Sequence, residues 1–268
     1  MRYCNMHTHT DFSDGLDTVE ANVKSAIDKN MISLGISDHC YTYFDTSYCV
    51  QADRLAEYKN EVKRVKELYR DSIEVYLGIE LDGFARLPDR ADYEYIIGDI
   101  HYVETPDGFR AVDLDKNEFI EICEKYFGGD SVNMAISYYR SYAERVCPMR
   151  PDILGHIDLV TKYSLVDQTD PRYVRAAKEA LAAALEVCPI IEINSGAISR
   201  GYRTDPYPAV FLLDEIKERG GKILLSSDSH AAKDITCFFE GERELLLSRG
   251  IKSAVVYTGG HFEEVGII

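Results

Sequence analysis

Short apolar runs alternate with amphipathic segments along the whole chain. The apolar runs predict strands at residues 2–6, 32–37, 74–81, 95–102, 153–157, 190–194, 222–226 and 254–257. The amphipathic segments predict helices from about residue 17 onward and at residues 52–70, 116–127, 132–146, 171–187, 207–219 and 241–249. This alternation is typical of a parallel sheet with crossover helices, and about seven or eight such units favour a closed α/β barrel.

We expect one domain over residues 1–268, because no repeat, low-complexity stretch or linker divides the chain. The net charge of −16 disfavours long nucleic acids and anionic membranes as partners. No run of ~18 uncharged apolar residues predicts a membrane span, and the start lacks an apolar signal-peptide core. The seven cysteines form no CxxC pair, which favours reduced thiols in a cytosolic protein. The sequence neither predicts nor excludes a homo-oligomer.

Six of the seven histidines fall at or just beyond the ends of predicted strands. In barrels the carboxyl ends of the strands form the functional face, so these side chains are expected to converge there. They are His7, His9, His39, His101, His156 and His230. The seventh, His261, is interpreted as a surface residue.

Carboxylates accompany these histidines. His7 and His9 are two residues apart and therefore point to the same side of an extended chain, where they can bind one ion together. Acidic residues follow in a turn, where either Asp11 or Asp14 is the candidate ligand, and others end later strands. The latter are Glu80, Asp99 and Asp228. Mixed imidazole and carboxylate sets suit Zn²⁺, Mn²⁺ or Fe²⁺ better than Ca²⁺.

The ordered set resembles the PHP family, the polymerase and histidinol phosphatase superfamily. An HxH pair near the N-terminus and a DxH pair near the C-terminus carry the resemblance, with His39, Glu80, His101 and His156 between them in the family's order. The resemblance implies a distorted seven-stranded (β/α) TIM-like barrel with two or three divalent metals at the carboxyl ends of the strands. The implied ligand sets are His7, His9, Glu80 and Asp228; Glu80, His101 and His156; and Asp14, His39 and His230.

Two loops resemble those of stand-alone histidinol-phosphate phosphatases. They are Gly155-His156-Ile157-Asp158-Leu159-Val160-Thr161-Lys162-Tyr163 and the segment from Glu192-Ile193-Asn194-Ser195-Gly196 to Tyr207-Pro208. The family holds the ester's phosphate with basic side chains in these loops. The best match here is Arg200, followed by Lys162 and Arg203.

The resemblance implies hydrolysis of L-histidinol phosphate to L-histidinol and phosphate by a hydroxide that bridges two metals. Asp228, His230 and Asp99 are the candidate catalytic residues. The leaving alkoxide would be stabilised by a metal or protonated by a water, Asp99 or His230 are candidates to assist, and the sequence does not choose among them. Three alternatives stay open: a phosphatase or nuclease for another small ester or nucleotide, a non-catalytic metal-binding PHP module, and a metal-dependent amidohydrolase. The Ser227-Asp228-Ser229-His230 ending fits the last of these poorly.

Two groups of aromatic residues have different predicted roles. Tyr138, Tyr139 and Tyr142 lie in a predicted helix and are expected to pack in the core. Tyr41, Tyr43 and Phe44 follow His39 and are candidates for lining the mouth of a pocket.

Overall fold

The computed structural model describes residues 3–86 and 89–268, so Arg2 of the first predicted strand lies outside it. The strands are β1 (Cys4–Asn5), β2 (Ser33–Ile36), β3 (Glu74–Asp82), β4 (Tyr95–Asp99), β5 (Tyr102–Thr105), β6 (Gly108–Ala111), β7 (Ile153–Leu154), β8 (Ile190–Asn194), β9 (Lys222–Ser226), β10 (Ser253–Thr258) and β11 (His261–Gly266). The main helices are α1 (Val19–Asp28), α2 (Leu55–Leu68), α3 (Lys116–Phe127), α4 (Ser131–Ser141), α6 (Pro171–Val187), α8 (Val210–Glu218) and α9 (Phe239–Ser248). Short helical pieces are α5 (Cys147–Met149) and α7 (Gly196–Ser199).

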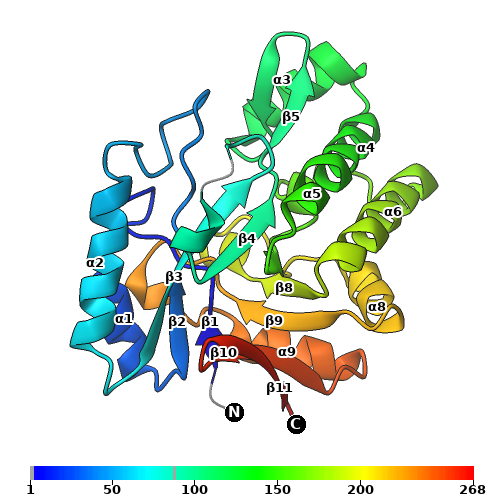
Figure 1. Cartoon of the computed structure of the whole chain (residues 1–268). Coiled ribbons are helices and arrows are strands. Elements are labelled where there is room, and N and C mark those ends of the chain that lie inside the picture. Colours follow the sequence, from blue (N-terminus) through cyan, green and yellow to red (C-terminus); the bar gives the residue numbers. More distant parts are fainter. Residues whose placement is uncertain (1–2, 87–88) are drawn as a thin grey trace.

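Nine strands form one sheet in the order β1-β2-β3-β4-β7-β8-β9-β10-β11. All neighbours are parallel except β10 and β11, which form an antiparallel hairpin. The sheet curls, because the chain just after β1 also meets the chain just after β9: Thr8 pairs with Ser229, and the amide of His9 donates to the carbonyl of Ser229 at 2.9 Å. The result is an α/β fold with a curled, TIM-like parallel sheet, and helices line its outside in Figure 1.

The hairpin of β10 and β11 lies beside the amino ends of the first strands, near the C-terminus in Figure 1. The amide of Tyr257 donates to Sγ of Cys4, and the hydroxyl of Thr258 donates to Glu74 at 2.9 Å. The predicted strand at 254–257 is present, whereas β11 was not predicted. His261 begins β11 and is exposed, as expected.

The inside of the curled sheet is packed around Tyr95. A Cβ atom on Gly78 would lie 2.2 Å from Cζ of Tyr95, and one on Gly35 would lie 2.0 Å from its hydroxyl oxygen. That hydroxyl donates to the carbonyl of Met6 at 2.6 Å. Only glycine fits at positions 35 and 78, because the ring of Tyr95 lies directly against the backbone there. Through these contacts and its hydrogen bond to Met6, the ring holds β1, β2, β3 and β4 together near the carboxyl ends of the strands.

Carboxylate and hydroxyl side chains cap the amino ends of several helices. The side chains of Thr18, Asp115, Asp130 and Asp170 accept hydrogen bonds from amides in the first turns of α1, α3, α4 and α6. The boundaries of α3 and α6 agree with the sequence prediction. The predicted helix at 132–146 instead continues beyond α4 as a π-helical segment, Tyr142–Val146, and the three tyrosines Tyr138, Tyr139 and Tyr142 are buried.

One predicted strand, at 95–102, is wrong in its last residues. The chain leaves the sheet after Asp99, because the amide of His101 turns to the carboxylate of Asp82 at 2.7 Å. It then forms the separate β5–β6 hairpin, which stands beside the functional end of the sheet in Figure 1.

Candidate metal centre and active site

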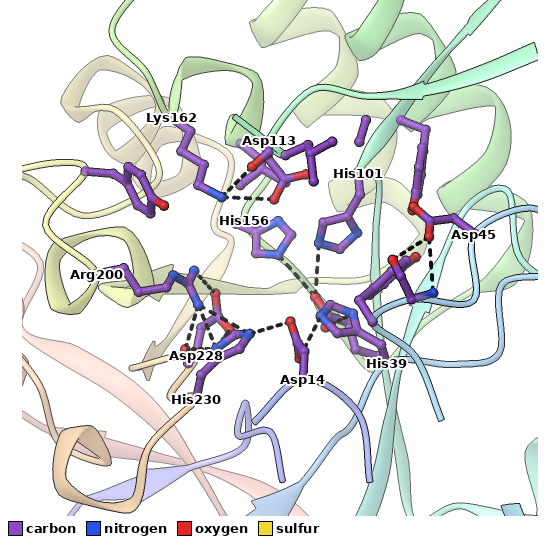
Figure 2. Close-up of a pocket in the computed structure, with 18 residues that line it drawn as sticks. Asp14, His39, Asp45, His101, Asp113, His156, Lys162, Arg200, Asp228 and His230 are labelled. Atoms are coloured by element: carbon purple, nitrogen blue, oxygen red, sulfur yellow. Dashed lines mark hydrogen bonds and ion pairs between the residues drawn. The ribbon is translucent and has the colours of Figure 1, made fainter. Parts of the chain in front are cut away.

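The predicted ligands converge at the carboxyl ends of the strands. They come from the segments after β1, β2, β4, β7 and β9, from β3 itself, and from the turn after the first strand. These residues are His7, His9, Asp14, His39, Glu80, His101, His156, Asp228 and His230. Figure 2 shows the labelled members of this group turned toward one cavity. Asp14 lines that cavity, whereas Asp11 does not, which favours Asp14 as the turn ligand.

Glu80 lies at the centre of the cluster and is 1% exposed. Its carboxylate oxygens lie 2.7 Å from Nδ1 of His39 and 3.1 Å from Nε2 of His156. They also lie 3.2 Å from Nε2 of His7 and 3.4 Å from Nε2 of His9. His101 is a little farther away, with Nε2 at 3.7 Å, so one carboxylate faces five imidazoles from the segments that follow β1, β2, β4 and β7.

The remaining carboxylates extend the cluster on either side. Asp228 Oδ1 lies 3.1 Å from Nε2 of His9. Asp14 Oδ2 lies 3.2 Å from Nε2 of His230. Four overlapping groups offer ligand atoms within 4.8 Å of one another: His9, Asp14, His39 and His230; Glu80, Asp99, His101 and His156; His7, His156 and Asp228; and His7, His9 and Glu80. Asp99, predicted as catalytic, thus joins a potential ligand group.

Several buried nitrogen and oxygen atoms of this cluster have no hydrogen-bond partner in the described part of the chain, and they indicate whether the cluster fits metal ions. Among the described residues, Nε2 of His7, both ring nitrogens of His9 and Oε2 of Glu80 are buried without a well-formed hydrogen bond. Buried polar atoms normally have a partner, and acceptor atoms directed at one another gain one when a cation lies between them. The imidazole nitrogens and carboxylate oxygens of the cluster, and their arrangement, therefore fit divalent metals.

Electrostatics of the metal-free site follow from the same arrangement. Burial alone would raise the pKa of Glu80, but the imidazoles of His39 and His7 outweigh it and hold that pKa well below its usual range. Burial disfavours the charged form of His39, yet the carboxylates of Glu80 and Asp14 raise its pKa to about 9. Burial and the neighbouring His230 and His39 lower the pKa of His9 to about 3.

Two supporting carboxylates were missed as functional residues. Glu192 accepts a hydrogen bond from Nδ1 of His7 at 2.9 Å and another from the amide of His156 at 2.8 Å. Asp82 lies 3.2 Å from Nδ1 of His101 and accepts from its amide. Carboxylates in such positions orient ligand histidines and increase their basicity. Their position in β8 and β3 was visible in the sequence, but nothing there identified their partners.

The three predicted phosphate ligands have different surroundings. Arg200 lines the cavity, where it donates to Oδ2 of Asp228 at 3.1 Å and lies 2.6 Å from Nδ1 of His230. Lys162 also lines the cavity, but its ammonium group is paired with Asp113 at 3.1 Å. Arg203 does not line it.

Arg203 is held elsewhere in the fold. Its guanidinium donates to the hydroxyl of Thr161 at 2.6 Å and to the carbonyl of Asp205, and it stacks on the ring of Tyr207. The geometry therefore gives no support to the phosphate role that the sequence suggested for Arg203.

The cavity has a volume of about 260 Å³ and opens beside the β5–β6 hairpin. It is lined by Asp14, His39, Asp45, Ser47, Tyr48, Glu80, His101, Tyr102, Ala111, Asp113, Leu114, His156, Leu159, Lys162, Arg200, Tyr202, Asp228 and His230. The prediction that Tyr41, Tyr43 and Phe44 line its mouth is wrong. The next residues of the same loop do so, and Phe44 packs against Tyr102 and Phe109 instead.

The PHP domain family model matches residues 5–196, which is more than half of the chain. The chain belongs to the PHP domain family. The expected family resemblance is thereby confirmed. Relatives of this PHP domain include a probable histidinol-phosphatase of Deinococcus radiodurans, 26% identical over 87% of this chain and 88% of its own length. The histidinol-phosphatase of Bacillus subtilis is 24% identical over 87% of this chain and 96% of its own length.

Two solved structures share the fold of this PHP domain. The putative histidinol phosphatase of Listeria monocytogenes superposes with a TM-score of 0.77 at 19% identity, covering 89% of this chain and 99% of its own. The histidinol phosphate phosphatase of Lactococcus lactis, complexed with zinc, L-histidinol and phosphate, superposes with a TM-score of 0.68 at 20% identity, covering 98% of this chain and 99% of its own.

Among the helices of the described residues, none combines the length and the apolar character that a membrane span requires.

Proposed function

We propose that this PHP domain is a metal-dependent phosphomonoesterase that hydrolyses L-histidinol phosphate to L-histidinol and phosphate. The observation that carries the proposal is the buried cluster of imidazoles and carboxylates at the base of a cavity, with the guanidinium of Arg200 beside it. Curated relatives named histidinol-phosphatase, and the Lactococcus lactis structure complexed with zinc, L-histidinol and phosphate, support this substrate.

We also propose how the barrel is closed and which residues would hold the metals. We take the seven parallel strands β1, β2, β3, β4, β7, β8 and β9 as a distorted (β/α)7 barrel within a single domain, residues 1–268, closed by the Thr8–Ser229 bridge. Two or three ions of Zn²⁺, Mn²⁺ or Fe²⁺ would be held at its carboxyl end by the three ligand sets expected from the sequence. The first two sets would share Glu80.

The metals, when bound, would neutralise phosphate charge and lower the pKa of coordinated water. The chain's own residues then determine how the ester is held. Arg200 would bind phosphate oxygens, because its fork of donors faces the cavity next to Asp228. Lys162 would add positive charge from the same wall, with its ammonium group held in place by Asp113.

Two residues were candidates to assist the leaving alcohol. His230 lines the cavity, whereas Asp99 is fully buried behind His101 and does not line it. Access from the cavity therefore favours His230. Asp99 belongs to a potential ligand group and is the less accessible candidate, and burial and the neighbouring Glu80 raise its pKa well above its usual range.

A substrate panel tests this function. Phosphate release from L-histidinol phosphate would be compared with release from sugar phosphates and from nucleotides, using protein of measured metal content. We expect a kcat/KM for L-histidinol phosphate on the order of 10⁴ M⁻¹s⁻¹ or above, and much lower values for the other esters. A clear preference for a nucleotide or a sugar phosphate would contradict the proposed substrate while keeping the metal-dependent chemistry.

A further inference from the structure

The charges that line the cavity are divided between its walls. Figure 2 places Lys162 and Arg200 on one side and Asp45 on the other, with the metal-ligand cluster between them. Both cations already have a carboxylate partner: Asp113 for Lys162, and Asp228 for Arg200. Asp45 differs, because no lysine, arginine or histidine among the described residues forms an ion pair with it.

The carboxylate of Asp45 is nevertheless held in a fixed position. Its Oδ1 accepts from the hydroxyl of Ser47 at 2.7 Å and from the amide of Ser47 at 3.2 Å. Its Oδ2 accepts from the hydroxyl of Tyr102 at 2.9 Å. A carboxylate offers about four lone-pair positions, so Oδ2 retains capacity for one more donor. The group is thus oriented by the protein but not neutralised by it.

Aromatic side chains connect this carboxylate to the metal-ligand cluster. The ring of Tyr48 lies edge-on to the ring of His39, with centroids 4.7 Å apart. It also lies 6.3 Å from the ring of His101 and 6.4 Å from that of Tyr102. Tyr48 therefore lies between the predicted ligands His39 and His101 and the tyrosine that holds Asp45, and Asp45 lines the same cavity as these ligands.

We propose that Asp45 determines substrate specificity by binding an ammonium group on the leaving alcohol, so that the enzyme selects phosphate esters of amino alcohols. The inference rests on the proposed function and adds to it the chemical feature that is recognised. Tyr48 and Tyr102 assist, because the faces of aromatic rings attract cations. A neutral ester of the same size leaves the carboxylate without a partner.

The test compares two substrates of which only one carries this charge. L-Histidinol phosphate and its N-acetyl derivative share the imidazole and the phosphate, but only the first has an ammonium group. In the wild type we expect kcat/KM to favour the cationic ester on the order of 10- to 100-fold, the effect of one charge-assisted hydrogen bond. In Asp45→Asn we expect that preference to fall toward unity, through a higher KM for the cationic ester.

Asp53→Asn is the matched control, because Asp53 is exposed, forms no ion pair among the described residues and does not line the cavity. It should retain the wild-type preference. Metal content and circular dichroism establish that each variant is folded. Equal losses for both esters in Asp45→Asn, or an unchanged preference, would overturn the inference.

A second pair of esters separates this inference from the proposed function. If L-histidinol phosphate were not hydrolysed, the proposed function would fail, and 2-aminoethyl phosphate would then be compared with ethyl phosphate. A preference for the aminated ester that disappears in Asp45→Asn would still support the ammonium site. The absence of such a preference in the wild type would overturn it.

Discussion

Oε2 of Glu192 accepts a hydrogen bond from Nδ1 of His7 at 2.9 Å, and both side chains are fully buried. This bond fixes the proton of His7 on Nδ1 and leaves Nε2 to face Glu80, 3.2 Å away. The other oxygen of Glu192 holds the amide of His156. A single carboxylate of β8 thereby orients His7 and His156, two predicted ligands that follow β1 and β7.

Glu192→Gln should weaken metal binding. The amide retains the shape of the side chain but not its negative charge, so His7 becomes a less basic ligand. We expect the affinity for the most loosely held ion to fall about 10- to 100-fold, measured by competition with a chelating indicator. Glu218→Gln, at an exposed position, is the control. An affinity equal to that of the wild type would show that Glu192 does not support the metal site.

Metal loading should release protons. In the metal-free protein the carboxylates of Glu80 and Asp14 outweigh burial and raise the pKa of His39 to about 9, so its ring is protonated at pH 8. An imidazole must be neutral to bind a metal, so loading expels this proton. A pH indicator in weak buffer measures the release. His39→Asn should release about one proton fewer than the wild type. The exposed His261→Asn is the control and should match the wild type. Equal release from the wild type and both variants would contradict His39 as a ligand.

Arg200→Ala should raise KM for the phosphate ester more than it changes metal content. The lost guanidinium donates toward the cavity beside Asp228, and charge-assisted bonds to phosphate suggest an increase on the order of 10-fold or more. Arg203→Ala is the matched control, because that guanidinium is held by Thr161 outside the cavity. Steady-state kinetics of both variants decide the point: an unchanged KM in Arg200→Ala would remove it from the phosphate site.

Gly78→Ala should destabilise the fold. The new Cβ atom would meet Cζ of Tyr95 at 2.2 Å, and this ring is buried and held by the hydrogen bond from its hydroxyl to the carbonyl of Met6. Overpacking of this kind costs about 1–3 kcal/mol in the free energy of unfolding, which denaturant titration measures. Gly266→Ala in β11 meets no atom within 4 Å and should stay within about 0.5 kcal/mol of the wild type. Equal stability of the two variants would refute the packing argument.

Much of the fold could be predicted from local patterns. The helices α3 and α6 and the strands β8 and β9 have the predicted limits, because capping residues and continuous apolar runs mark them directly. The β5–β6 hairpin was missed, since the chain leaves the sheet where Asp82, distant in sequence, captures the amide of His101. Such tertiary contacts have no local signature.

The residues of the candidate site were also predictable only in part. Its histidines and Glu80 could be predicted because strand ends of one sheet converge and because their order resembles a known family. Glu192 and Asp45 could not, because what distinguishes them is the partner each faces: a ligand imidazole for Glu192 and an open cavity for Asp45. Both depend on segments brought together only by folding.

Metal-dependent hydrolysis is tested most directly by phosphate release from L-histidinol phosphate, using protein that has been stripped of metal and then reloaded. We expect activity to disappear on stripping and to return with Zn²⁺, Mn²⁺ or Fe²⁺, and we expect Asp228→Ala and His9→Ala to stay inactive after reloading while keeping their fold. Full turnover by the stripped protein, or wild-type rates in either variant, would contradict this expectation.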